Sequence, residues 1–401
     1  MITVEQATER VLATAKPLSP EFVSLEQARG RVLAEDLTAD RDFPPFHRVT
    51  MDGIAIAFSA FQAGNRTFRI AGIQAAGEPQ LSLDNSLDCL EVMTGAVLPQ
   101  NTDTVIRYED LDIRDGVAQL QIEQIQAGQN VHRQGHDRKT GDLIIPHPRM
   151  LSPAEIGVAA TIGKSLVRVL RQPKVVIIAT GDELVPVDAQ PLPHQIRISN
   201  AYQLAAALDS WQIHAERLHL RDDPQQTREQ LAHCLSHYDA IILSGGVSMG
   251  KYDHVPTALD ELGVQKSFHR VMQRPGKPFW FGVSTDGKPV FAFPGNPVSS
   301  FVGITRYFLP WLKQSLGLQP FSQHAAILGK DFSFTPHLTY FLQVRIHFND
   351  KGQLIGMPFE GHGSGDLANL ADADAFMQLP AEQTDFKQGE VFPVFFYRMH
   401  L

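Results

Sequence analysis

The sequence has little cysteine and no long apolar run. Cys89 and Cys234 are the only cysteines in 401 residues, and they lack CxxC spacing, which excludes a disulfide framework and a cysteine-built structural zinc site. No uninterrupted apolar stretch could cross a bilayer, and the N-terminal segment lacks the basic start and apolar block of a secretory signal. We therefore expect two buried thiols in a soluble, cytoplasmic protein with no membrane partner.

An excess of positive charge is also missing. The 35 Lys and Arg residues are outnumbered by 44 Asp and Glu residues, which gives a net charge of -9. A general nucleic-acid binder needs a basic face to displace counterions from phosphates, so no nucleic acid is expected as a partner. An anionic ligand would instead need a local basic pocket. The chain length exceeds what one hydrophobic core usually serves, which predicts two to four domains.

Helical and β-leaning patterns alternate in the first 173 residues. Capping-box spacings begin at Thr3, Ser24 and Ser152, and apolar residues follow the first two at helical intervals. Short β-leaning runs divided by Gly, Pro and Asn lie between the second and third of these spacings. The pattern predicts two N-terminal helices and the following domains: a discontinuous helical domain over 1–42 and 146–173, and an inserted β-rich domain over 43–145.

Strands and helices alternate regularly from residue 174. The order strand, helix, strand, helix, strand is typical of parallel βαβ units. Further β segments lead to a helix that begins near Asn296 and runs to about Leu312, and β-leaning pieces return after Gly317. The predicted fold class is multidomain α/β plus β, with an α/β domain over 174–317 and a small C-terminal β domain over 318–401.

Three glycine-bearing loops follow strands of the α/β region. Ligands bind outside the carboxyl ends of the strands in an open parallel sheet, and helix N-termini there favour phosphates or oxyanions. One such glycine most often only meets a backbone requirement. Three in register favour a crevice for an anionic ligand. The loops are Thr180-Gly181-Asp182-Glu183, Ser244-Gly245-Gly246-Val247-Ser248 and Pro294-Gly295-Asn296-Pro297.

Charged residues accompany these loops. Four carboxylates at the same edge suit a Mg²⁺ ion shared with substrate phosphates: Asp182, Glu183, Asp222 and Asp253. For Asp222 and its neighbour Asp223, capping of the helix before Pro224 is the alternative. Three cations that could grip an anion, or lie in a solvated turn, follow: Arg270, Arg274 and Lys277.

The inserted domain has polar loops at Asp52, Thr94 and Asp137. Asp and Thr beside Gly are ordinary turn chemistry, which favours a structural interpretation from the residues alone.

The ordered set of motifs resembles the molybdopterin molybdenumtransferase family, MoeA, whose domain also occurs at the C-terminal end of gephyrin-type proteins. The match covers about residues 1 to 320, with a weaker tail in which GHGSGD at 361 fits only loosely. The motifs are MDGIA at 51, MTGAVLP at 93, RQGHD at 133, TGDEL at 180, SGGVSMGKYD at 244, RPGKP at 274 and PGNPVSS at 294.

This resemblance implies an elongated homodimer of four-domain chains, with a doubly wound, MogA-like α/β domain that binds molybdopterin. The implied reaction is the final step of molybdenum-cofactor synthesis: adenylylated molybdopterin reacts with molybdate, AMP leaves with the help of Mg²⁺, and the metal ends on the dithiolene. Because the sulfur belongs to the substrate, two unremarkable cysteines fit this chemistry. A pterin-adenylylating enzyme and molybdoenzyme apoproteins are the implied further partners.

Roles follow from the matching motif positions. The resemblance implies that Asp52, Thr94 and Asp137 reach the partner chain's crevice, so that activity depends on dimerisation. The implied catalytic residues are Asp182, Glu183, Asp222, Asp253, Asp52 and Asp137, the first four also as Mg²⁺ ligands. The implied substrate-binding residues are Thr94, Thr180, Gly181, Ser244, Gly245, Gly246, Ser248, Arg270, Arg274, Lys277, Gly295, Asn296, Pro297 and Ser299.

Three positions depart from the family pattern. Ile54 stands where the family usually has Tyr, Arg274 where it has Lys, and His136 where it has Glu. A near-neutral residue beside Asp137 would weaken cation binding there or change its pH dependence. His136 and Ile54 keep open the alternative of a non-catalytic pterin-binding scaffold. A nucleotide pyrophosphatase that uses the same fold in another context is a third hypothesis.

Overall fold

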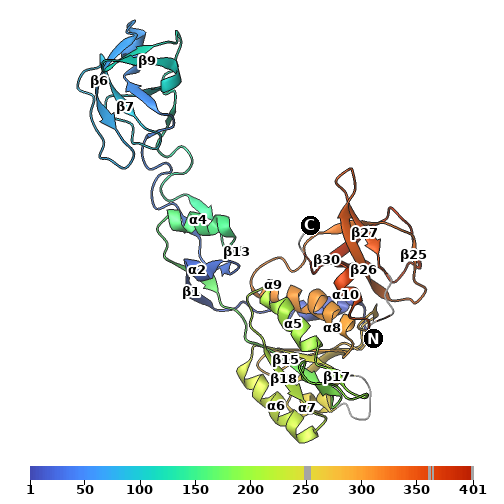
Figure 1. Cartoon of the computed structure of the whole chain (residues 1–401). Helices are drawn as coiled ribbons and strands as arrows, with labels where there is room; N and C mark the ends of the chain where they lie inside the picture. The colour runs from blue at the N-terminus through green and yellow to red at the C-terminus, as the bar shows by residue number, and fades with distance from the viewer. Residues whose placement is uncertain (248–253, 360–362, 364, 399–401) are drawn as a thin grey trace.

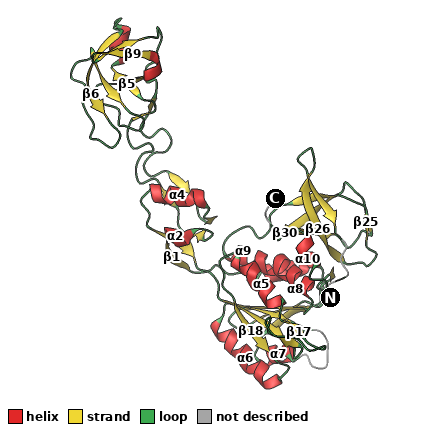
Figure 2. Ribbon diagram, viewed as in Figure 1, coloured by secondary structure: helices red, strands yellow, loops and turns green. Residues whose placement is uncertain are grey.

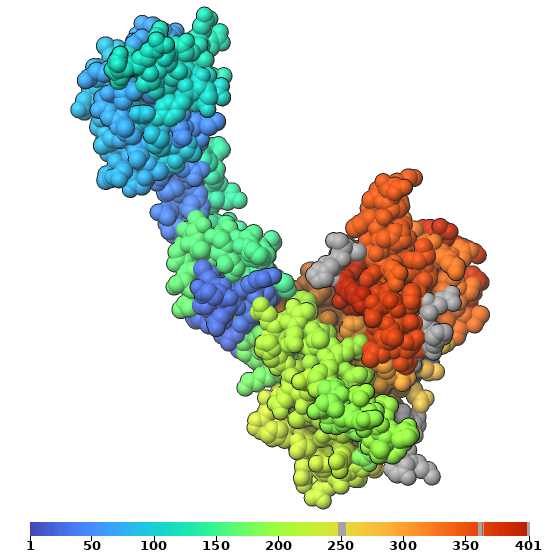
Figure 3. Space-filling view, viewed as in Figure 1, coloured from blue at the N-terminus to red at the C-terminus, as the bar shows by residue number. Residues whose placement is uncertain are grey.

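The computed structural model describes residues 1–247, 254–359, 363 and 365–398. Figure 1 shows an elongated chain in which the inserted domain lies at the far end of a narrow arm, away from the α/β and C-terminal domains. The space-filling view shows the inserted domain as a separate lobe (Figure 3). Among the described residues, no helix combines the length and the apolar character needed to cross a membrane.

The arm is built on a four-stranded sheet rather than on helices alone. Its antiparallel strands, in spatial order, are β1 (Pro20–Ser24), β14 (Leu166–Leu170), β2 (Val32–Leu33) and β13 (Arg149–Met150). Two helices pack on this sheet, α2 (Leu25–Ala28) and α4 (Pro153–Thr161). Two short ladders continue the arm: β3 (Leu37–Thr38) with β12 (Leu143–Ile145), and β4 (Arg48–Val49) with β11 (Val131–His132).

The second predicted N-terminal helix needs correction. It is only the four-residue helix α2, its N-cap Ser24 makes no side-chain capping bond, and β2 follows where the helix was expected to continue. Gly30 has φ +77, a left-handed conformation that ends a helix. Val32 and Leu33 pair with β13 and β14, so sheet pairing overrides the local helical spacing.

The capping boxes predicted at Thr3 and Ser152 both form, and they begin α1 (Val4–Leu12) and α4. Helix α1, however, does not pack on the arm. Its buried residues Val4, Ala7 and Val11 belong to the core of the α/β domain, and Ile2 forms a bridge to Val271. The N-terminal segment therefore packs against the α/β domain, whose residues are far from it in the sequence, and not against the arm that follows it in the chain.

The inserted domain is a six-stranded sheet with short helical segments, α3 (Phe58–Gln62) and a 3₁₀ turn at Tyr108–Asp110. Buried apolar residues from the two faces of the sheet form two small cores. In spatial order the strands are β8 (Thr104–Arg107), β5 (Gly53–Ile56), β7 (Asp88–Val92), β6 (Thr67–Gln74), β10 (Val117–Leu120) and β9 (Leu111–Arg114).

The α/β domain confirms the predicted fold class. Four neighbouring strands of its sheet pair in parallel, and two further strands join one edge through antiparallel pairings. Figure 2 shows helices on both faces of the sheet. The strands, in spatial order, are β18 (Glu216–Leu220), β15 (Val175–Thr180), β19 (Ala240–Ser244), β23 (Pro289–Phe293), β22 (Trp280–Val283) and β20 (Gln265–His269).

Strand β15 shows why this sheet is buried on both sides. All six of its residues are buried. Val175 and Ile177 pack with α5 (Asn200–Asp209) and α1, whereas Val176 and Ile178 pack with α6 (Pro224–His237) and α7 (Val255–Glu261). A continuous apolar run is what a parallel strand covered by helices requires.

A long, continuous helical segment follows β23. It consists of α8 (Pro297–Gly303), a π-helical turn (Ile304–Phe308) and α9 (Leu309–Ser315), which confirms the predicted helix. Pro310 has no N–H to bond to the carbonyl one turn earlier, and a widened turn is a common response to such a gap.

The C-terminal domain is a strongly curved sheet closed by a pairing between β26 and β28. Strand β21 (Gln273–Arg274) comes from the α/β region but pairs with β26, so it ties the two domains together. The remaining strands are β24 (Ala325–Leu328), β26 (Thr339–Phe348), β27 (Leu354–Pro358), β28 (Ala375–Leu379), β30 (Val391–Phe396) and the pair β25 (Phe332–Ser333) with β29 (Asp385–Phe386), beside α10 (Asn369–Asp372). The domain boundaries given above stay predictions.

Both cysteines are buried, as predicted. Burial raises the pKa of the Cys89 thiol to about 12 and that of Cys234 to about 11. Neither thiol is therefore an activated nucleophile.

Candidate active-site crevice

A cavity of about 600 Å³ lies at the carboxyl ends of the parallel strands. It is bounded by the three glycine loops and by the segment that opens α5. Two small strands, β16 (Leu184–Val185) and β17 (Ile196–Arg197), form one wall. Lining residues that the sequence had singled out are Thr180, Gly181, Glu183, Asp222, Ser244, Gly245, Gly246, Gly295, Asn296 and Pro297.

The glycines let two loops approach more closely than side chains would permit. Gly245 has φ +100, and a Cβ there would lie 2.7 Å from Thr180 Oγ1 and 2.9 Å from the Thr180 carbonyl oxygen. Gly246, with φ +68, would bring a Cβ to 2.9 Å from Thr180 Oγ1. The backbone amide of Gly245 donates to the Phe293 carbonyl at 3.0 Å, which joins this loop to β23. At this loop the crevice wall is therefore formed by backbone rather than by side chains.

Asn200 is a site residue that sequence reasoning missed. Its Nδ2 donates to Ser244 Oγ at 2.9 Å and to the Gly295 carbonyl at 2.7 Å, so it links two of the glycine loops. Arg197 and Ser199 also line the cavity, and the sequence analysis singled out neither of them as a site residue. The available signal was the Ser-Asn pair at the start of a predicted helix on the same sheet edge, where polar residues face the ligand side.

The acidic residues divide between the cavity and its rim. Glu183 and Asp222 line the cavity, and Asp182 lies beside them because its Oδ1 accepts the Asp222 backbone N–H at 3.2 Å. Asp223 instead caps α6, accepting from the Gln226 N–H at 2.7 Å, so the capping alternative holds for Asp223. Asp253, like Ser248 among the substrate-binding residues, lies outside the described residues.

Carboxylates at this edge fit a Mg²⁺ ion only as part of a larger ligand set. Within the described ranges, Asp182, Glu183 and Asp222 do not bring three ligand atoms within 4.8 Å of one another. Mg²⁺ usually takes one or two carboxylates and completes its shell with water and substrate phosphates. The donor chemistry therefore fits an ion that arrives with a phosphorylated substrate.

The predicted basic residues do not line the large cavity. Arg274 lies in β21 and lines a smaller cavity, of about 60 Å³, with Tyr340, Gln343 and Phe359. Pairing of β21 with β26 explains this displacement towards the C-terminal domain. Three further predicted residues also fall outside the large cavity's lining: exposed Arg270, exposed Lys277 and buried Ser299.

The inserted domain gathers its three polar loops, which we call the insert loops (residues 51–53, 93–95 and 132–137). Asp52 Oδ1 accepts from the Thr94 backbone N–H at 2.6 Å and from Thr94 Oγ1 at 2.7 Å. These bonds lower the pKa of Asp52. The loops are held together because the backbone at 49–50 bonds to both Ala96 and Asn130.

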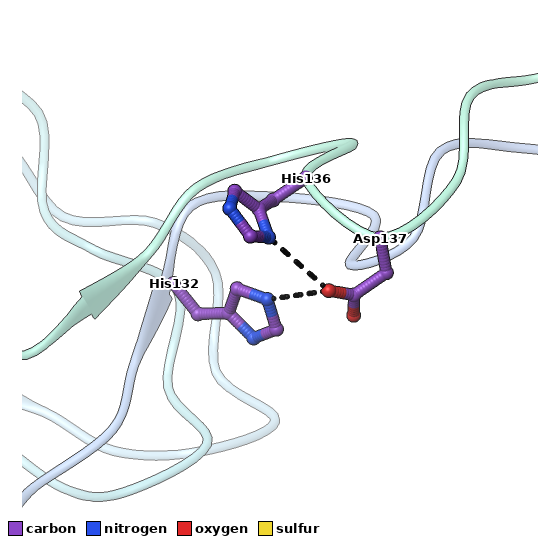
Figure 4. Close-up of side chains that lie close together, drawn as sticks. All are labelled: His132, His136 and Asp137. Carbon is purple, nitrogen blue, oxygen red and sulfur yellow. Dashed lines mark hydrogen bonds and ion pairs between the residues drawn. The ribbon is translucent and has the colours of Figure 1, made fainter.

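Asp137 is the centre of the third insert loop. Figure 4 shows His132 and His136 pointing at the same carboxylate oxygen, at 2.9 and 3.3 Å. Hydrogen bonds from His132 and then His136 lower the pKa of Asp137. Within one chain these loops lie at the end of the arm remote from the crevice (Figure 1).

Ile54, one of the departures from the family pattern, is fully buried in the inserted domain's core. The apolar residue thus fits its surroundings and does not contribute a polar group to the insert loops.

Family models match nearly the whole chain. The MoeA N-terminal region (domain I and II) matches residues 2–163, a probable molybdopterin binding domain matches residues 176–314, and the MoeA C-terminal region (domain IV) matches residues 325–397. The chain belongs to the MoeA family. The resemblance read from the motifs is thereby confirmed.

Individual relatives agree along their full length. A protein of Synechocystis sp. strain PCC 6803 named molybdopterin molybdenumtransferase is 39% identical over 398 residues, covering 98% of this chain and 100% of the relative. A Bacillus subtilis strain 168 protein of the same name is 30% identical, covering 99% and 94%. A crystal structure titled molybdopterin biosynthesis MoeA protein, from Pyrococcus horikosii, is similar with a TM-score of 0.83 and 28% identity, covering 100% of both chains.

Proposed function

We propose that this MoeA-family chain is a molybdopterin molybdenumtransferase acting in molybdenum-cofactor biosynthesis. It inserts molybdate into adenylylated molybdopterin: water cleaves the phosphoanhydride bond so that AMP leaves, and the two dithiolene sulfurs of the pterin replace oxygen ligands of molybdate, which depart as water. The observation that carries the proposal is the cavity of about 600 Å³ walled by three glycine loops at the carboxyl edge of the sheet. Full-length similarity to relatives of that name supports the same substrate class.

The crevice residues would bind and orient the phosphorylated pterin. Gly245, Gly246 and the start of α8 at Asn296 and Pro297 line the cavity. Because the Gly245 N–H is already bonded to the Phe293 carbonyl, the positive end of the α8 dipole is the backbone feature that would favour phosphate oxygens here. Asn200 keeps the Ser244 and Gly295 loops at a fixed separation. Preorganised donors of this kind stabilise charge that develops as the anhydride breaks.

Mg²⁺, when bound, would neutralise phosphate charge and favour departure of AMP. Asp182, Glu183 and Asp222 are the described candidates to hold it, with Asp253 as a further candidate from its motif position. Arg270, Arg274 and Lys277 are the candidates for molybdate, because forked and point cations suit a tetrahedral oxyanion.

A second copy of the chain would complete the site. The inserted domain, which carries Asp52, Thr94 and Asp137, lies at the far end of the arm from the α/β domain (Figure 1), so these residues would contribute to catalysis in a partner's crevice. Such a homodimer with shared sites would work in the cytoplasm, receive substrate from a pterin-adenylylating enzyme and supply molybdoenzyme apoproteins.

The direct test is AMP release from adenylylated molybdopterin with Mg²⁺, with and without molybdate. We expect molybdate-dependent AMP release that falls sharply in Asp182→Asn and Lys277→Ala but not in Asp188→Asn, an exposed acid outside the cavity lining. Absence of AMP would sink the proposal. Tight pterin binding without product, unchanged in Asp222→Asn, would identify a scaffold, and hydrolysis of free dinucleotides without molybdate would identify a pyrophosphatase.

A further inference from the structure

The two histidines beside Asp137 have no part in the proposed function. His132 Nε2 lies 2.9 Å and His136 Nδ1 lies 3.3 Å from Asp137 Oδ1. One ligand atom from each of these three residues lies within 4.8 Å of the other two. Figure 4 shows the two rings converging on the carboxylate from different parts of the loop. The three side chains therefore surround one point in space.

Two of the three separations, 2.9 and 3.3 Å, are close to those between the ligands of a tetrahedral metal ion, and the third is within 4.8 Å. Bonds of about 2.0–2.1 Å place neighbouring ligand atoms roughly 3.3–3.4 Å apart. Two imidazoles and one carboxylate suit Zn²⁺, Co²⁺ or Ni²⁺, whereas Mg²⁺ and Ca²⁺ prefer oxygen ligands throughout. We propose that His132, His136 and Asp137 form a binding site for a divalent transition metal of the Zn²⁺ class, with one coordination position left open.

The backbone holds this loop in place. His132 pairs with Arg48 in the ladder of β11 and β4, and the Asp137 N–H donates to the Phe43 carbonyl at 2.9 Å. Gly135, with φ +65, makes the turn between them. The side chains of His136 and Asp137 are 71% and 52% exposed, so an ion reaches them without any opening of the fold.

Arg48 opposes metal binding because it favours the His132 tautomer that has its proton on Nε2. Its Nη2 lies 3.2 Å from His132 Nδ1, and because a guanidinium only donates, Nδ1 accepts and Nε2 carries the proton that faces Asp137. A metal on Nε2 requires the proton to sit on Nδ1, where Arg48 no longer has an acceptor. Arg48→Gln should therefore tighten metal binding, since it also removes a nearby positive charge.

A second pair of histidines provides the control. His233 and His237 stack on α6 with ring centroids 4.0 Å apart, but no carboxylate joins them in a three-ligand group among the described residues. Two-ligand binding there would be weaker than binding at the insert loop.

The experiment is a titration of the full-length chain, without a polyhistidine tag, with Co²⁺ and Zn²⁺. Absorption of bound Co²⁺ reports the ligand geometry, and calorimetry reports the affinity. We expect one tight ion per chain, at least about tenfold weaker binding in His132→Ala and in His136→Ala, no change in His233→Ala, and tighter binding in Arg48→Gln.

Unchanged affinity in either of the two alanine variants of the loop, or loss of the tight ion in His233→Ala, would overturn the proposal. If His132→Ala does not fold, the largely exposed His136 carries the test. The readout is metal binding alone, so a chain that releases no AMP would still be tested by it.

Discussion

The crevice and the insert loops are both polar sites, but they are built in opposite ways. The crevice is a cavity of about 600 Å³ in which Gly245 and Gly246 present backbone, with no side chain, to the neighbouring Thr180 loop. The insert loops carry charged side chains held by short hydrogen bonds, with the pKa values of Asp52 and Asp137 lowered by those bonds. The crevice provides a shaped cavity, and the insert loops provide carboxylates with lowered pKa values.

This difference agrees with the proposal that the two regions act together. The crevice offers a cavity, backbone and acids at its edge. The inserted domain carries fixed carboxylates on a lobe that the arm separates from the α/β domain (Figure 1). A homodimer with shared sites would bring both sets of groups to one place.

The largest expected effect comes from adding a side chain to the crevice wall at Gly245. In Gly245→Ala the new Cβ would lie 2.7 Å from Thr180 Oγ1 and 2.9 Å from the Thr180 carbonyl. The loop must shift, and a displacement of about 1 Å near reacting groups costs roughly a hundredfold in rate. The measurement is AMP release under single-turnover conditions.

Gly64→Ala is the matched control for this variant. Gly64 has φ +96, close to the φ +100 of Gly245, but a Cβ there meets nothing within 4 Å. It isolates backbone strain of about 1 kcal/mol from the clash. Equal rate losses in both variants would contradict the close-approach argument.

The second effect concerns the carboxylates of the insert loops. Asp52→Asn removes the charge while leaving a group that can still accept from Thr94. Because this carboxylate is exposed and screened by solvent, we expect a loss of only about tenfold in the rate of AMP release. Asp84→Asn, an exposed acid in the same domain, should have no effect, and a comparable loss there would argue against a specific role.

Sequence patterns predicted the elements that depend on near neighbours. The capping boxes at Thr3 and Ser152, the alternating strands and helices after residue 174, and the glycine loops all depend on short spacings. These features supplied the fold class and about half of the residues that line the crevice.

What the sequence did not predict depends on pairings between distant segments. Helix α1 packs on the α/β domain and β2 replaces a helix. Strand β21 pairs with β26, so Arg274 lines a smaller cavity rather than the crevice. Asn200 likewise acquires its role only when the Ser244 and Gly295 loops meet beside it. No local spacing records such contacts.

A third prediction tests the junction between the arm and the α/β domain. Arg171, just after β14, forms two bonds to Asp239, of 2.6 and 2.8 Å. Arg171→Ala should cost about 1.5–3 kcal/mol of unfolding free energy and increase proteolysis at the junction. Arg69→Ala, which breaks a similar pair with Asp88 inside the inserted domain, should leave the junction intact, and equal cleavage in both variants would contradict this assignment.

The same ion pair predicts a pH dependence. Burial raises the pKa of Asp239, but hydrogen bonds from Arg171 and the Lys174 N–H lower it overall. A lowered folded pKa means that the pair's contribution is complete above the ordinary Asp value and is lost as pH falls through the folded value. Urea unfolding near neutral pH and at about pH 3 should show a smaller acid-induced loss in Arg171→Ala than in the unsubstituted chain.

The smallest expected effect concerns the cysteines. With thiol pKa values raised to about 12 for Cys89 and about 11 for Cys234, alkylation of the folded chain at neutral pH should be far slower than in urea, where both thiols become exposed. Mass spectrometry after a short pulse of iodoacetamide measures this difference. Rapid labelling of the folded chain at either thiol would contradict the burial described above.

The measurement that tests the shared site most directly is complementation between two impaired variants. Asp182→Asn impairs the crevice, and Asp52→Asn, which is expected to keep about a tenth of the rate, impairs the insert loops. When the two chains are mixed and allowed to exchange subunits, each mixed dimer has one crevice and one set of insert loops that are both intact and face each other. Random exchange should restore about a quarter of the unsubstituted activity. Activity that stays at the average of the two separate variants would contradict a site shared between chains.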